Sequence, residues 1–146
     1  MELSDDEPLN DYEPPRAWVD EDQVWFDLAV ARLLRDLTTT TGLRPWLEVD
    51  LSDPEHPDLA YRYSRDSNVR VMGHGQWLRP PESPAEAVLV VADPFTEDVI
   101  EELWTAWPVC PGHGHPAEVR VVGDDAVWAC PKSGETIAVV GELPTP

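Results

Sequence analysis

The stretch AWVDEDQVWFDLAVARLLRDLTTTTG, residues 17–42, predicts a long helix from which the rest of the fold can be worked out. Its apolar residues recur at spacings of three and four, which is typical of one helix face; they are Val24, Trp25, Leu28, Ala31, Leu34 and Leu37. A second apolar set widens this face and consists of Phe26, Ala29 and Leu33. The acids at 20–22 favour the helix start, and the Thr run with Gly42 indicates its end.

Beyond this helix the hydrophobic period changes to two, which is typical of strands. The alternating segments are 47–51, 59–63 and 69–71, the last continued past a Gly break by 76–78. An uninterrupted apolar run, AVLVVA at 87–92, predicts a central strand covered on both faces. Together these segments predict an antiparallel meander of about four strands.

The dipeptide Asp93-Pro94 predicts the start of a second helix, because Asp caps helices well and Pro suits the first helical position. We expect Pro108 to end this helix. Its apolar stripe would be Phe95, Val99, Ile100, Leu103, Trp104 and Trp107, and its polar face Glu97, Asp98, Glu101 and Glu102. The expected fold class is α+β: helix, meander and second helix in a core domain at 17–107, then a three-stranded hairpin segment at 108–146 packed on that core.

The charge of the chain restricts its partners. It has 29 acidic and 10 basic residues among 146, for a net charge of -19, which repels nucleic-acid phosphates. We therefore expect no nucleic-acid partner and a protein partner instead, with a basic protein as the better match. Residues 1–16 hold six acids and three prolines and predict a disordered acidic tail. The basic island Arg62, Arg65, Arg70 and Arg79 is interpreted first as pairing with the acids of 82–107, and second as an anion site.

Compartment and source are indicated by composition. We find no signal peptide and no apolar run near the ~18 residues of a membrane span, so we expect a cytoplasmic protein without a membrane partner. In that compartment the two cysteines are expected to be reduced, whereas an oxidising one would favour a Cys110–Cys130 disulfide. Nine of the ten basic residues are Arg, and with abundant Ala, Val, Asp and Pro this indicates a bacterial coding sequence.

The segments CPGHGH (110–115) and CPKSG (130–134) carry the only specific chemistry in the sequence. Predicted strands flank them: AEVRVVG and AVWAC joined by a GDDA turn, and ETIAVVGEL after the second Cys-Pro. This arrangement resembles a zinc ribbon, in which two Cys-Pro-x-Cys-Gly turns on paired hairpins hold one Zn²⁺. The resemblance covers about the last quarter of the chain. It implies Cys110, His113 and Cys130 as ligands, with Ser133, a poor zinc ligand, at the fourth position.

His115 could replace the missing ligand, because Gly112 and Gly114 allow its imidazole to reach the same ion. The predicted site is therefore Cys110, His113, His115 and Cys130, holding structural zinc. His74, in MGHGQ, is the alternative fourth ligand. Two other interpretations stay open: a degenerate ribbon that folds without metal, and an open metal site or reactive thiol.

Function is predicted at the level of class. The sequence has no phosphate-binding loop, no nucleophile elbow and no His-Glu-x-x-His helix. The element order also resembles secretion-chaperone-like adaptors, and small acidic domains serve as immunity proteins for basic toxins. We expect a non-catalytic acidic protein-binding module of adaptor, chaperone-like or immunity-like type. The alternative is a metal-dependent enzyme with an open site at His74, His113 and His115. The oligomeric state stays open.

Overall fold

The computed structural model describes residues 16–44, 46–53, 58–62, 70–71 and 78–146. In these ranges the elements are α2 (Asp20–Thr41), β1 (Trp46–Asp50), β2 (Asp58–Arg62), β3 (Arg70–Val71), α3 (Pro84–Leu103), β4 (Glu118–Val122), β5 (Asp125–Ala129) and β6 (Thr136–Val139). The predicted α+β class is confirmed. The three alternating segments form β1, β2 and β3, which pair antiparallel in that order. Of the proposed continuation at 76–78, residues 76 and 77 lie outside the described residues, and Leu78 is described but is not in a strand.

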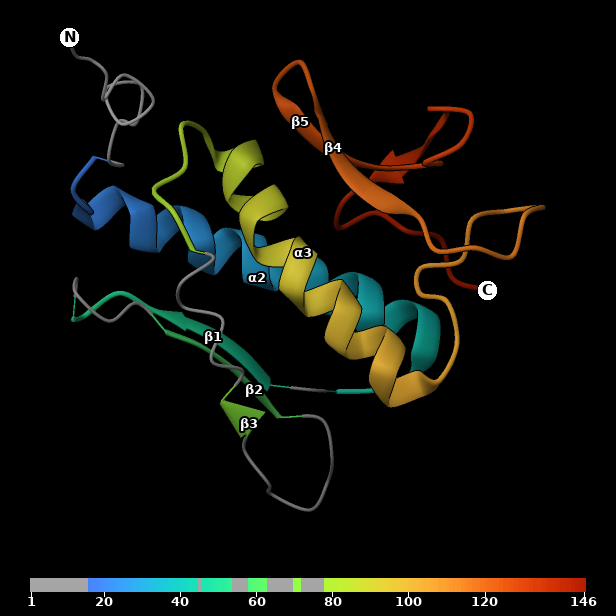
Figure 1. Ribbon diagram of the computed structural model, residues 1–146, viewed down its shortest axis with the longest axis horizontal. Coiled ribbons are helices and arrows are strands. Elements are labelled where there is room, and N and C mark those ends of the chain that lie inside the picture. The colour runs from blue at the N-terminus through green and yellow to red at the C-terminus, as the bar shows by residue number, and fades with distance from the viewer. Residues whose placement is uncertain (1–15, 45, 54–57, 63–69, 72–77) are drawn as a thin grey trace, which may run out of the picture.

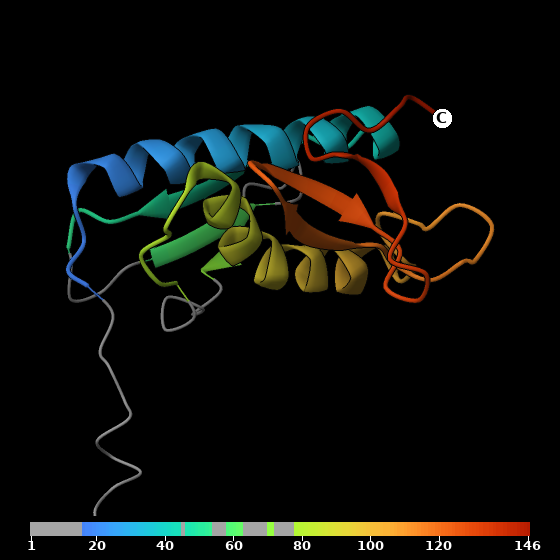
Figure 2. The ribbon, with the colours of Figure 1, turned by 90° about the horizontal axis from the view of Figure 1, so that it is seen from above.

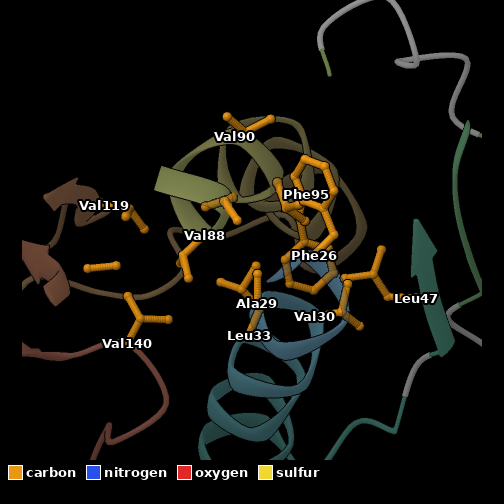
Figure 3. Packing of buried hydrophobic residues seen from close by; sticks show 14 of the residues in the cluster. Phe26, Ala29, Val30, Leu33, Leu47, Val88, Val90, Phe95, Val119 and Val140 are labelled. Atoms are coloured by element: carbon orange, nitrogen blue, oxygen red, sulfur yellow. The ribbon is translucent and has the colours of Figure 1, made fainter. Parts of the chain in front are cut away.

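The two helices lie between two antiparallel sheets. The β1-β2-β3 sheet is on one side, against α2, and the β4-β5-β6 sheet is on the other, against α3 (Figures 1 and 2). Figure 3 shows Val119 and Val140 on one side of the helices and Leu47 on the other. All three belong to one hydrophobic cluster with the helices, so the segment after residue 108 shares the core of the rest of the chain.

The predicted first helix is confirmed as α2, but its buried face differs from the predicted stripe. Gly42 ends it in the left-handed conformation, with φ of 79° and its N–H bonded to the carbonyl of Thr38 at 2.9 Å. The buried row consists of Phe26, Ala29, Val30, Leu33 and Leu37. Val24 and Leu28, from the predicted stripe, are 56% and 51% exposed. Two neighbouring rows of α2 are apolar, and only one of them is fully buried where α3 and β1 pack against the helix.

The predicted strand at 87–92 is wrong, and so is the helix start at Asp93, because both segments belong to α3. Ser83 caps this helix by accepting the N–H of Glu86 at 3.0 Å, and Pro84 is its first residue. The helix is apolar on most sides because it packs against α2 and against β4 and β5. Its buried residues include Ala87, Val88, Val90, Val91 and Ala92.

The end of α3 also differs from the prediction, because the helix stops at Leu103 and not at Pro108. Trp104, predicted to lie on the apolar stripe, is 92% exposed. Trp107 lies beyond the helix and is buried, with edge-to-face contacts to Phe95 and Trp128 at ring-centroid distances of 6.1 and 5.5 Å. The chain therefore leaves α3 four residues earlier than expected and re-enters the core at Trp107.

The N-terminal end of α2 is held by an ion pair. Residues 1–15, most of the predicted tail, lie outside the described residues, but Arg16 is described. Its guanidinium binds the carboxylate of Asp22 at 2.8 and 3.0 Å and the carbonyl of Pro81 at 2.7 Å. The Asp22 carboxylate also accepts the N–H of Val19 at 2.9 Å, which satisfies a donor ahead of the first helical turn. In the part of the chain covered by the structure, no helix is both long and apolar enough to cross a bilayer.

Candidate metal centre

The first Cys turn is a short loop closed by backbone hydrogen bonds. The carbonyl of Cys110 accepts the N–H of His113 at 3.1 Å and that of Gly114 at 3.4 Å. The N–H of Cys110 donates to the carbonyl of His115 at 2.8 Å. Gly114 has φ of 79°, a left-handed conformation that glycine adopts without a Cβ clash. The loop thus fixes three potential ligands within six residues.

The second Cys turn repeats this geometry. The carbonyl of Cys130 accepts the N–H of Gly134 at 2.8 Å, and its N–H donates to the carbonyl of Glu135 at 2.9 Å. Gly134 also has φ of 79°. Ser133 thereby occupies the position that His113 has in the first turn, as the resemblance to a zinc ribbon implied. The strands around this turn, β4, β5 and β6, are those predicted from the sequence.

The structure brings together all four predicted ligands, and one ligand atom of each lies within 4.8 Å of the others. The Nδ1 of His113 lies 3.3 Å from the Sγ of Cys110 and 3.4 Å from the Sγ of Cys130. The Nε2 of His115 lies 3.9 Å from the Sγ of Cys130. With Zn–S of about 2.3 Å and Zn–N of about 2.05 Å, a tetrahedral ion separates S from N by about 3.6 Å. The observed separations lie on both sides of that value, so the four side chains are close enough to hold a metal ion.

Sulfur and imidazole face the centre from different sides. Cys110 and Cys130 are buried, whereas His113 is exposed and His115 half-buried. The two imidazole rings are stacked, with a centroid distance of 5.0 Å and an interplanar angle of 24°. The sulfurs therefore lie toward the core and the imidazoles toward solvent. The cysteines are free thiols and are not joined in a disulfide.

Ser133 supports the sulfur of Cys130. Its backbone N–H donates to that sulfur at 3.4 Å, and its hydroxyl oxygen accepts the N–H of Glu135 at 3.2 Å. Hydrogen bonding from Ser133 lowers the pKa of the Cys130 thiol to about 5. Burial raises the pKa of the Cys110 thiol, and the neighbouring Cys130 raises it further. The two sulfurs are therefore electronically different, with the thiolate favoured at Cys130.

A tryptophan two or three residues before each cysteine is hydrogen-bonded to α2. The indole Nε1 of Trp107 donates to the hydroxyl of Thr40 at 3.0 Å. The indole Nε1 of Trp128 donates to the buried carboxylate of Asp36 at 2.8 Å. These two positioning contacts were not predicted. The only sequence signal concerns the second contact and is an acid at position 36, inside the apolar row that contains Leu33 and Leu37.

Some predicted features lie elsewhere or outside the described residues. His74, the alternative fourth ligand, falls in the segment 72–77, which the structure does not describe. Within the basic island only Arg79 has a described side chain, and it is exposed. Burial raises the pKa of Asp93 in α3, and the nearby charge of Arg79 acts in the opposite direction. Whether the island pairs with the acidic helix therefore stays a prediction.

The chain matches no protein-family model, no curated protein and no solved structure. The geometry of the four side chains is thus the basis for a functional assignment.

Proposed function

We propose that Cys110, His113, His115 and Cys130 bind one Zn²⁺ in a closed structural site, within a non-catalytic acidic protein that binds another protein. The observation that carries the metal proposal is the convergence of two thiols and two imidazoles from two turns of the same backbone geometry. Thiolate and imidazole are the ligands that tetrahedral Zn²⁺ prefers, and two of each make a common structural set.

The number of donors supports a structural role. A catalytic zinc ion usually has three protein ligands and keeps a fourth position for water or substrate. Here four side chains of the chain itself are available, and His115 takes the place that Ser133 leaves empty in the zinc-ribbon pattern. A four-ligand set leaves no open position for the metal-dependent enzyme considered as the alternative.

Local energetics support a role for the metal in folding. The loop from Pro108 to Ala117 has few apolar contacts of its own: Val109, Pro111, Gly112, His113 and Gly114 are exposed. Bound Zn²⁺ would join this loop to the turn after β5, and its binding free energy would add to the stability of the folded state.

The metal proposal is tested by metal content. The full chain, purified without added zinc, should hold one Zn²⁺ by elemental analysis, and Cys130→Ser should lose it. Co²⁺ in place of Zn²⁺ should give the visible absorption of a tetrahedral site and the near-ultraviolet band of Co²⁺–thiolate bonds. His56→Ala is the matched control, since it removes a histidine remote in sequence from both turns. The proposal would be contradicted if the unchanged chain held no metal and Cys130→Ser had the same unfolding curve.

The proposed protein-binding role is supported by charge. A net charge of -19 favours encounter with a basic protein and repels phosphate backbones. The test is isolation from native lysate over a series of salt concentrations. A stoichiometric protein partner released by salt is expected, and the absence of any protein partner at every salt concentration would count against the role.

A further inference from the structure

We infer that a groove between the end of α3 and the first Cys turn binds an arginine side chain of a basic partner protein, with Trp104 as the surface on which the guanidinium stacks. This inference rests on the proposed protein-binding role and gives it a location. The groove has a volume of about 930 Å³. It is lined by Ile100, Glu101, Glu102, Trp104, Thr105, Ala106 and Pro116.

Trp104 has features that the fold does not need. Trp104 is 92% exposed, whereas Trp107 and Trp128 are only 4% and 0% exposed. Its φ of 57° and ψ of 32° are left-handed, a conformation that helices usually give to glycine at this position. For a residue with a side chain this conformation is strained. A large apolar ring held in a strained, exposed position stabilises neither the core nor the helix, but it is available to a ligand.

The charges around Trp104 select a cation. Glu101 and Glu102 both line the groove, and the last turn of α3 carries no basic residue. They lie at the C-terminal end of the helix, where its dipole is negative, so two carboxylates there repel the helix end and each other. A cation beside them relieves that repulsion. Over the face of a Trp ring, a cation is also attracted by the negative charge of the π-system.

Arginine matches this combination better than other basic groups. Its planar guanidinium can stack on an indole while its N–H groups donate to carboxylates at the rim. Its aliphatic stem can lie along the apolar part of the groove, at Ile100, Ala106 and Pro116.

The groove adjoins the candidate metal centre. Pro116 follows His115, and the pairing of Val109 with Pro116 closes the first Cys turn. The N–H of Ala117 donates to the carbonyl of Pro108 at 2.7 Å, and this hydrogen bond helps to fix the side of the groove that Pro116 forms. Bound metal would therefore stabilise one side of the groove, and removing it should weaken arginine binding while the Trp104 side stays in place.

The experiment titrates the ¹⁵N-labelled full chain with the blocked peptide Ac-Gly-Leu-Arg-Leu-Gly-NH₂. The indole N–H signal of Trp104 is assigned by its loss in Trp104→Phe. We expect a saturable shift of that signal, affinity about tenfold lower when Arg in the peptide is replaced by Gln, and no saturable shift when it is replaced by Glu. A Trp104 signal that does not move, or that moves equally with all three peptides, overturns the inference.

Matched variants locate the charge effect. The double variant Glu101→Gln/Glu102→Gln should bind the Arg peptide at least about fivefold more weakly and with less dependence on salt. Glu97→Gln, on the exposed side of the same helix and outside the groove, should stay within about twofold of the unchanged chain. Equal weakening in both cases would make the effect one of net charge and overturn the groove as the site.

The outcome for the native partner separates the two proposals. If a basic protein binds the full chain and the Trp104→Ala variant equally well, the groove is not the binding site, and the proposed protein-binding role is still supported. If no protein binds but the Arg peptide shifts the Trp104 signal, arginine binding in the groove is supported and the proposed protein-binding role is contradicted. A dimer in sedimentation that disappears in Trp104→Ala would make a second copy of the chain the occupant and overturn the arginine assignment.

Discussion

The carboxylate of Asp36, in the C-terminal part of α2, accepts a hydrogen bond from the indole of Trp128 at 2.8 Å across a sequence separation of 92 residues. It also accepts the backbone N–H groups of Gly141 at 2.6 Å and Leu143 at 3.0 Å. All of these contacts are buried. One carboxylate thus joins the first helix to β5, just before the Cys130 turn, and to the last residues of the chain.

Asp36→Ala should therefore destabilise the protein strongly. It leaves three buried donors without their acceptor, and loss of a partner in such a buried network costs roughly 3–5 kcal/mol. Urea unfolding followed by circular dichroism measures the difference. Asp27→Ala, on the exposed side of the same helix, is the control and should change the unfolding free energy by less than about 0.5 kcal/mol. A similar small effect at both positions would contradict the role of Asp36.

Removal of metal should loosen the Cys turns before the rest of the fold. With a chelator, amide hydrogen exchange should speed up first in residues 108–117 and 130–135, because their backbone bonds lie in exposed turns held by the ligands. The α2 amides should stay protected, since Phe26, Leu33 and Leu37 are fully buried. Ser133→Ala is the control and should keep its metal. Uniform loss of protection would show that the two parts unfold together.

Ser133→Cys should rescue the metal binding that His115→Ala loses. Ser133 has the position in the second turn that His113 has in the first, so a thiol there can supply the fourth ligand. The double variant should bind one Co²⁺ with a stronger thiolate band than the unchanged chain, because three sulfurs replace two. His115→Ala with Ser133→Ala is the matched control without a new donor. Equal metal affinity in the two double variants would contradict the predicted geometry.

Protonation of Asp22 should contribute to acid unfolding. The hydrogen bonds from Arg16, and then that from the N–H of Val19, lower the pKa of this carboxyl below its usual value of about 3.9. A lowered folded-state pKa adds stability above the unfolded value, and this stability is lost as the pH falls through the folded value. Asp22→Asn should therefore cost about 1–2 kcal/mol at pH 7, and the difference should shrink below about pH 4. Asp20→Asn, an exposed acid in the same turn, should show a much smaller dependence.

Trp104→Gly should stabilise the protein. Glycine adopts the left-handed conformation of this position without strain, and the exposed ring contributes no burial that could be lost. We expect a gain of roughly 1 kcal/mol and a higher melting temperature, whereas Trp104→Ala, which keeps the Cβ, should change little. A clear loss of stability in Trp104→Gly would show that the ring has a structural role.

Residues close in sequence determined much of this protein. The helix of residues 20–41 and its end at Gly42 follow from apolar spacing and a glycine stop, which act within a few residues. The strands β4, β5 and β6 follow from three short apolar segments, the first two of which are joined by a GDDA turn. The clustering of Cys110, His113, His115 and Cys130 follows from two Cys-Pro turns beside a hairpin, because turn geometry and strand pairing fix how far apart these side chains lie.

Only the tertiary structure decided what depends on packing. The run at 87–92 has the apolar character of a buried strand or a buried helix. In the folded chain it is a helix, and α2, β4 and β5 pack around it. Which apolar row of α2 is buried depends on where α3 lies, so Leu28 is exposed and Leu33 is not. The contacts of Asp36 join residues about 100 positions apart, and no local pattern specifies them. Trp104 looks like a core residue by spacing, and it is left exposed because α3 ends one residue before it.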